Sequence, residues 1–175
     1  MQGLEGIAFT VHGRDGLDLV EPLWKELAAH HLERAETAAP AFATGMAALT
    51  FAARRDELLA KNRDRALRIE LAVDPAAGGP VGYCVASGAP GGHGEVESIF
   101  VDAAYRGRGI GGALLDHAAA WMDELGTIEQ ALSVFAANER VLPFYARHGF
   151  APRFVVLVRR PPGELETAIR PRRQP

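Results

Sequence analysis

The sequence has one cysteine, and this scarcity excludes two kinds of stabilisation. A lone thiol, Cys84, can form neither an internal disulfide nor a multi-thiolate metal site. It lies in the run PVGYCVAS, which is typical of a strand, so we expect a small buried apolar side chain and not a reactive thiol. The histidines include no H-x-x-x-H pair with acids suited to zinc. The sequence therefore predicts no metal site.

Long apolar runs and a strong excess of one charge are also lacking. No apolar run approaches the roughly 18 residues that span a bilayer. The N-terminal stretch MQGLEGIAFT lacks the charged region and long apolar region of a secretory signal. A net charge of -3 gives no reason to expect a nucleic-acid or anionic-membrane surface. We expect a cytoplasmic protein with no membrane or nucleic-acid partner.

The first half of the chain contains helix and strand patterns in turn. Its 175 residues, 48% of them hydrophobic, are enough for a real core. Apolar residues at helical spacing predict amphipathic helices over 17–35 and 46–61, with Pro22 in a first turn. Three short strand-like runs follow, separated by the turns PAAGGP and GAPGGHG, and they predict an antiparallel meander: ALRIELAVD, PVGYCVAS and GEVESIFVD.

The second half continues from a glycine-rich turn. A helix is expected from this turn to about Gly126, then a strand in ALSVFAA, a short helix in ERVLPFYARHGF and a last strand in RFVVLVRR. The order predicts an α+β fold, with a mixed, largely antiparallel central sheet flanked by helices. We expect one domain over residues 1–160 and a C-terminal tail over 161–175.

The glycine-rich turn, IFVDAAYRGRGIGGALL, has two interpretations. Gly107, Gly109 and Gly112 spell the dinucleotide fingerprint G-x-G-x-x-G, whereas Arg106 to Gly111 spell R-x-x-G-x-G. In both, a helix N-terminus offers unpaired N–H groups and a partial positive charge to an anion, and glycines let the backbone approach it. A plain strand-to-helix turn with solvated arginines is the alternative without a ligand.

The dinucleotide interpretation fits the flanking sequence poorly. It needs a parallel βαβ unit with an acid at the end of the next strand, and ALSVFAAN ends without one. The preceding run carries Glu95 and Glu97, whereas a central parallel strand is nearly all apolar. The absence of G-K-[ST] excludes a P-loop.

The other interpretation accounts for much more of the chain. IFVDAAYRGRGIGGALL resembles the acetyl-CoA-binding motif of the GNAT (GCN5-related N-acetyltransferase) superfamily, and ANERVLPFYARHGF is similar to that family's later segment. The order of elements agrees as well, so the resemblance covers nearly the whole chain and is most specific over residues 95–150. It implies acetyl-CoA as acyl donor, direct transfer to an amine without an acyl-enzyme, and a homodimer.

The resemblance also implies the residues that bind the donor. Backbone amides of the turn would wrap the coenzyme A pyrophosphate, and the preceding strand would pair with the pantetheine arm. A strand N–H would polarise the acetyl carbonyl, which can be worth ~3 kcal/mol. Asn138 matches a position that contacts the pantetheine or orders the next helix; a plain N-cap is the alternative. The other positions are Ile99, Phe100, Val101, Arg106, Gly107, Arg108, Gly109, Ile110 and Gly111.

Two side chains are implied in catalysis. Tyr145 matches the general acid that protonates the leaving thiolate, although its spacing alone would also suit a core position. The base that some members carry on the later strand is missing, because Ser133 stands there. Glu97 matches a base on the earlier strand. Alternation would place Glu95, Glu97, Ile99 and Val101 on one face, and burial could raise the carboxylate pKa. A solvent-facing or salt-bridged acid is the alternative.

The acceptor is left open by the sequence. Residues 38–45, which we expect to help form its pocket, match nothing specific; the acceptor could be a small amine, an amino acid, an antibiotic or a protein N-terminus. The acyl group could be acetyl or longer. An acyl-CoA-binding module without turnover and a dinucleotide-binding protein stay as alternative functions.

Overall fold

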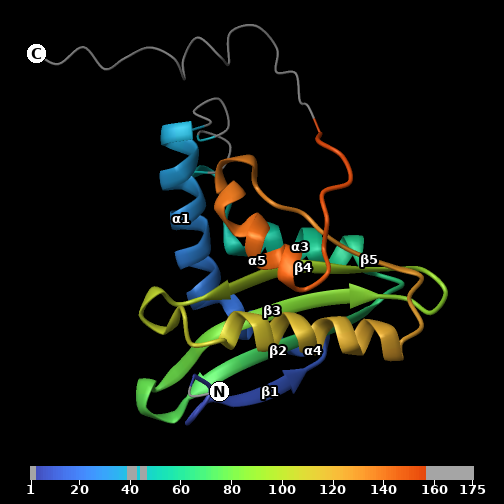
Figure 1. Cartoon of the computed structure of the whole chain (residues 1–175), viewed down its shortest axis with the longest axis horizontal. Helices are drawn as coiled ribbons and strands as arrows, with labels where there is room; N and C mark the ends of the chain where they lie inside the picture. The colour runs from blue at the N-terminus through green and yellow to red at the C-terminus, as the bar shows by residue number, and fades with distance from the viewer. Residues whose placement is uncertain (1–2, 39–42, 44–46, 157–175) are drawn as a thin grey trace, which may run out of the picture. The chain divides into compact units, whose positions relative to one another are not determined.

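The structure is a computed structural model that describes residues 3–38, 43 and 47–156, and the predicted meander forms most of its sheet. Its described strands form one five-stranded sheet in the order β1-β2-β3-β4-β5 (Figure 1). The first four pair antiparallel, and β5 runs parallel to β4. The predicted mixed, largely antiparallel sheet is confirmed. The strands are β1 Ala8–His12, β2 Ala66–Asp74, β3 Gly79–Gly88, β4 His93–Val101 and β5 Glu129–Leu132.

The helices follow the predicted order with shifted ends. Pro22 lies in the first turn of α1, as expected. Helix α3 begins at Phe51, where the Thr50 hydroxyl accepts a bond of 3.2 Å from the Ala53 amide, and not at Met46, which lies outside the described residues. The helical segments are η1 Arg14–Val20, α1 Glu21–Ala38, α3 Phe51–Lys61, η2 Pro75–Ala77, η3 Ala103–Tyr105, α4 Ile110–Glu124, η4 Ala136–Val141 and α5 Leu142–Arg147.

Two predictions about strands are corrected. Strand β5 ends at Leu132, so most of ALSVFAA is not a strand. Residues 153–156 of the expected last strand have no regular structure; the rest of RFVVLVRR and the tail lie outside the described residues. In the described part of the chain, no helix is both long and apolar enough to cross a bilayer.

The chain packs as two compact units. One takes in the chain up to residue 27 together with residues 50–133, and it holds the sheet, η1, α3 and α4. The other takes in residues 28–49 and the described residues from 134 onward, including α5.

In the first unit, α4 packs on one face of the sheet. A Cβ built on Gly94 would lie 2.4 Å from the Met122 sulfur, and one on Gly88 would lie 2.9 Å from Leu125, so α4 sits directly on glycines of β3 and β4 (Figure 1). The neighbouring side chain of Glu95 reaches Lys61 at the end of α3. Because side chains alternate along a strand, α3 contacts the opposite face. The buried side of α4 consists of Ile110, Leu114, Leu115, Ala118 and Met122.

An arginine from the N-terminal segment caps the end of α3. The Arg14 guanidinium donates to the carbonyls of Asn62 (2.6 Å) and Arg65 (3.1 Å), and more weakly to that of Leu59 (3.5 Å). The last carbonyls of a helix have no partner within it and carry partial negative charge, so a cation is favourable there. This bond network fixes the end of α3 beside the sheet.

Candidate active site

Strand β4 has an unpaired edge next to the glycine-rich turn. Its parallel pairing with β5 runs from His93 opposite Glu129 to Val96 opposite Leu132, where β5 ends. Strand β4 continues to Val101, and in the described residues no strand pairs with this later half on that side. The unpaired edge therefore offers backbone donors and acceptors to an extended ligand.

A register shift in β4 precedes the unpaired edge. Val96 lies opposite Ala86 and Ser98 opposite Val85, so Glu97 is an extra residue with no partner on β3. The bulge breaks the alternation of side chains. Our expectation that Glu95, Glu97, Ile99 and Val101 share one face is therefore wrong: Glu95 and Glu97 point to α3, and the face changes after the bulge.

Backbone directions at this edge follow from one close contact. The Phe100 carbonyl oxygen lies 3.2 Å from where a Cβ on Gly82 would be, so Phe100 turns its polar backbone toward β3. In an antiparallel pair, consecutive residues direct these groups to opposite sides, so Ile99 and Val101 present theirs to the open edge. The Val101 carbonyl accepts a bond of 3.0 Å from Arg106 Nε.

The turn after β4 has the backbone geometry of an anion site. Gly107 and Gly109 adopt φ values of 77° and 84°, in the left-handed region that side chains disfavour. Gly109 is the N-cap of α4 and supplies no side-chain cap. Within the described residues, no hydrogen bond satisfies the amides of Gly107, Arg108 or Gly109. A helix N-terminus with such amides suits a phosphate.

The two arginines of the turn are held by neighbouring rings. Besides its bond to Val101, Arg106 stacks over Phe100 at 5.4 Å from the ring centroid. Arg108 lies 5.0 Å from the ring centroid of Tyr105, whose hydroxyl donates to Asp74 at 3.0 Å. Their positive charges are therefore kept beside the turn.

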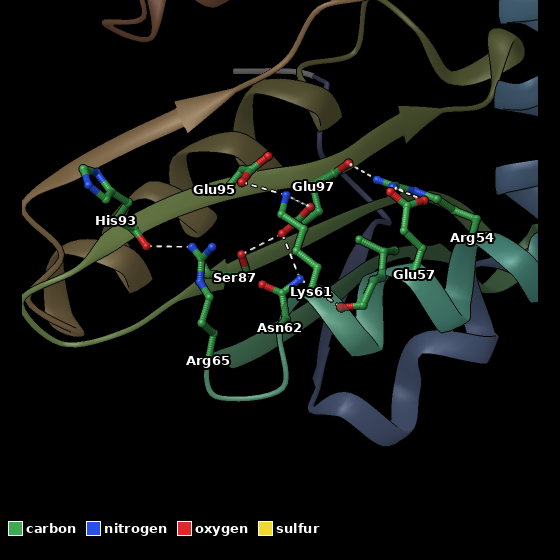
Figure 2. Close-up of polar contacts among 10 residues, drawn as sticks. Arg54, Glu57, Lys61, Asn62, Arg65, Ser87, His93, Glu95 and Glu97 are labelled. Carbon is green, nitrogen blue, oxygen red and sulfur yellow. Dashed lines mark hydrogen bonds and ion pairs between the residues drawn. The ribbon is translucent and has the colours of Figure 1, made fainter.

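Glu97 is a buried acid bound by three donors (Figure 2). Its side chain is 1% exposed, and its Oε2 accepts from Lys61 Nζ at 2.8 Å. Its Oε1 accepts from Asn62 Nδ2 and from Ser87 Oγ, each at 2.9 Å. Burial raises the pKa of Glu97, but these three donors and the Lys61 charge outweigh it and hold the pKa below its usual value. The expected rise of the pKa is therefore wrong, and the base role of Glu97 stays a prediction.

The partners of Glu97 were not singled out from the sequence as site residues. Lys61 also pairs with Glu95 at 2.8 Å, and the two carboxylates raise the pKa of Lys61 despite its partial burial. One signal was available: a strand acid that faces a protein interior needs a cation, and the sequence holds only two lysines. Ser87 lies on the neighbouring strand β3, and its contact with Glu97 can be predicted only when the pairing of β3 with β4 is known.

The remaining predicted residues, Asn138 and Tyr145, belong to the second unit. Asn138 lies within η4 with φ and ψ of -116° and 32°. The N-cap of α5 is Val141, without a side-chain cap, so Asn138 does not have the N-cap role considered as an alternative. Tyr145 packs edge-on against Phe144, with 5.1 Å between ring centroids, and near Phe150. The contacts of these residues with a donor stay predictions.

Two other features bear on the chemistry. Cys84 is buried as expected, and this burial raises the pKa of its thiol to about 12. Its thiolate is therefore scarce at neutral pH. In the described part of the chain, no three His, Cys, Asp or Glu side chains gather to hold a metal ion.

Comparisons with known proteins agree with this geometry. The chain is 47% identical over 58 residues to a mycothiol acetyltransferase from Propionibacterium freudenreichii, a match that covers 33% of this chain and 19% of that protein. The chain thus spans less than a fifth of that relative's length.

Solved structures share the fold over a longer range. A GCN5-related N-acetyltransferase from Ralstonia eutropha superposes with a TM-score of 0.62 at 24% identity, covering 88% of this chain and 98% of that one. An aminoglycoside N-acetyltransferase in complex with coenzyme A gives a TM-score of 0.57 at 19% identity, covering 88% and 99%. A profile of the acetyltransferase (GNAT) family matches residues 27–150. The profile match covers more than half of the chain, and the unpaired edge of β4 and the turn after it are consistent with it. The chain therefore belongs to the GNAT acetyltransferase family.

Proposed function

We propose that the protein transfers an acetyl group from acetyl-CoA to a primary amine. The observation that carries the proposal is the direct succession of an unpaired strand edge and an anion-suited turn. Ile99 at that edge offers an N–H and a carbonyl to an extended pantetheine arm. The amides of Gly107 to Gly109, which have no hydrogen-bond partner among the described residues, then meet the pyrophosphate where α4 begins.

The transfer is a direct attack on the thioester. The neutral amine nitrogen bonds to the carbonyl carbon, and the resulting oxyanion accepts a hydrogen bond from a backbone N–H of the β4 edge. The carbon–sulfur bond then breaks, and Tyr145 donates its proton to the departing thiolate. Before the attack, the ammonium form of the acceptor loses a proton to water or to Glu95, the more exposed of the two β4 carboxylates at 26%. After the bond forms, the nitrogen releases a second proton to solvent, and the Tyr145 phenolate takes a proton back from solvent. Cys84 takes no part.

Release of free thiol tests the proposal. The protein is incubated with acetyl-CoA and a panel of amines that contains amino acids, an aminoglycoside and peptides with free N-termini. An active amine should produce thiol and acetylated amine in equal amounts, and Tyr145→Phe should lower kcat by about 10²-fold, the low end for loss of an acid. Phe144→Leu, which alters the neighbouring ring and leaves the hydroxyl, is the matched control.

The alternatives give different outcomes. Coenzyme A binding with no turnover across the panel would leave an acyl-CoA-binding module. A rise in melting temperature with NAD+ or NADP+ but not with acetyl-CoA would indicate a dinucleotide-binding protein; a ligand at 100 times its Kd stabilises a fold by ~2.7 kcal/mol. The cytoplasmic location, the homodimer and the choice of an acetyl over a longer acyl group stay predictions.

A further inference from the structure

Glu97, which directly follows the last residue of β4 that pairs with β5, is contacted by side chains of α3 and its C-cap. Glu97 is the extra residue of the bulge, and the last β5 pair lies one residue before it, at Val96. Residues of α3 and its C-cap bind both the side-chain carboxylate and the backbone carbonyl of Glu97 (Figure 2). Lys61 and Asn62 bind its carboxylate, and Arg54 donates to its backbone carbonyl at 3.4 Å. The bulge is thus fixed by side chains and not by strand pairing.

The side-chain amide of Asn62 is buried in the orientation that binds Glu97. It is 0% exposed, and its amide nitrogen donates both to the Leu58 carbonyl and to Glu97. Its Oδ1 is buried without a partner among the described residues. An unsatisfied buried acceptor costs about 1–3 kcal/mol, so the orientation that serves Glu97 is kept against a local cost.

The carboxylate of Glu97 is poorly placed to accept another proton. Three donors already occupy its oxygens, and to take up a proton it would have to weaken its pairing with Lys61. Loss of Lys61 would strand the buried Glu97 carboxylate, whereas Lys61 itself is 38% exposed and keeps Glu95 as a partner. Glu95, which shares the same Lys61, lacks the Asn62 and Ser87 bonds.

We propose that Glu97 is a positioning residue: its bonds to α3 fix the bulge, and the bulge gives the edge at Ile99 to Val101 the geometry that binds the pantetheine arm of the donor. This inference rests on the proposed function. It assigns Glu97 to donor binding and not to proton transfer, and it adds Lys61, Asn62 and Ser87 as residues that act through it.

Binding of coenzyme A, measured by calorimetry, tests the proposal apart from catalysis. In Glu97→Gln the new amide faces the Lys61 ammonium, and in Lys61→Met the carboxylate is stranded. We expect either variant to weaken coenzyme A about tenfold, within the range of typical couplings between linked sites. In the double variant, the Gln oxygen still accepts from Asn62 and Ser87, and no fully buried charge is left unpaired. Glu95 also loses Lys61, but its side chain is 26% exposed and stays hydrated, so Kd should return to within about threefold of wild type.

Kinetics separate positioning from base catalysis. With a positioning role, Glu97→Gln raises KM for acetyl-CoA while kcat at saturation falls by less than about fivefold, and the acidic limb of the kcat–pH profile is kept. A base would show a kcat loss of about 10²–10⁴-fold with unchanged Kd and no recovery in the double variant, and that result would overturn the proposal.

Two further variants guard the interpretation. Ser87→Ala keeps both charges and removes one bond, so it should fold and weaken coenzyme A about threefold, in proportion to its share of the contacts. Asp56→Asn removes an acid of α3 that is 75% exposed and lies 3.7 Å from Arg55, outside the contacts of Glu97; it should leave Kd within about twofold. Unchanged Kd in Ser87→Ala and in both charge variants would refute the role.

Failure of the proposed function can be told apart from failure of this inference. If the wild-type protein binds coenzyme A but acetylates no amine, the proposed reaction is refuted, while the comparison of Kd values still decides the role of Glu97. A wild-type protein that does not bind coenzyme A would overturn both.

Discussion

Replacing Gly109 by alanine separates the strain of the turn from its use as a binding site. Gly109 has φ of 84°, and an added Cβ meets nothing within 4 Å, so the whole cost of Gly109→Ala is conformational. The left-handed region costs a non-glycine residue roughly 1–2 kcal/mol. The lower entropy of the unfolded alanine chain offsets about 0.4–1 kcal/mol of this. The net loss is about 1 kcal/mol, a fall in Tm of roughly 2–4 °C for a chain of this size.

The opposite end of the same helix provides the control. Gly126 follows α4 with φ of 78°, and a Cβ there also meets nothing within 4 Å. Gly126→Ala should therefore lower Tm by the same amount. Only Gly109→Ala should weaken coenzyme A, by tenfold or more, because the amides that we propose to bind the pyrophosphate move with the strained residue.

The assay combines thermal melting with calorimetric titration of coenzyme A on both variants. Equal losses of stability with unequal losses of affinity would support a phosphate site at this turn. Equal affinities in the two variants would refute it, because strain alone would then explain both.

Two further predictions concern titrating groups. Burial raises the Cys84 pKa to about 12, so a thiol reagent at pH 8 should label native protein only as fast as it unfolds, and labelling as fast as for a free thiol would contradict the burial. Because the pKa of Glu97 is lowered in the folded state, it contributes stability above its unfolded pKa of about 4.3, and this stability is lost as pH falls through the folded pKa. Because the pKa of Lys61 is raised in the folded state, it contributes stability below its unfolded pKa of about 10.4, and this stability is lost as pH rises through the folded pKa. Melting curves should therefore show the advantage of wild type over Glu97→Gln narrowing below about pH 4, whereas an advantage that grows on acidification would indicate a raised pKa.

The sequence predicts most of the sheet because its signals are local. Gly/Pro turns separate β2 from β3 and β3 from β4, and the spacing from Leu114 to Met122 marks the buried face of α4. These patterns involve only a few neighbouring residues, so they can be interpreted without knowledge of the fold. The turn from Arg106 to Gly111 is likewise contiguous, and its left-handed glycines follow from the motif.

The bulge and the Glu97 contacts could not be predicted in the same way. A register shift belongs to two strands together, and one extra residue reverses which side chains face α3. Lys61 and Asn62 lie 36 and 35 residues before Glu97, so their effect on its pKa depends on how α3 docks. Simple alternation along β4 therefore gave the wrong face for Ile99 and Val101, and burial considered without these partners gave the wrong direction of the Glu97 pKa shift.

The arginine cap on α3 has a consequence for the order of folding. Arg14 lies 45 to 51 residues before the carbonyls it binds, so the last turn of α3 gains its cap only after a large loop has closed. An isolated peptide of this length is a marginal helix in water. We expect the end of α3, and with it the bulge that it holds, to form late, as a product of long-range docking. Donor binding would then report on completed folding of the N-terminal segment, although Arg14 itself belongs to neither the strand edge nor the turn.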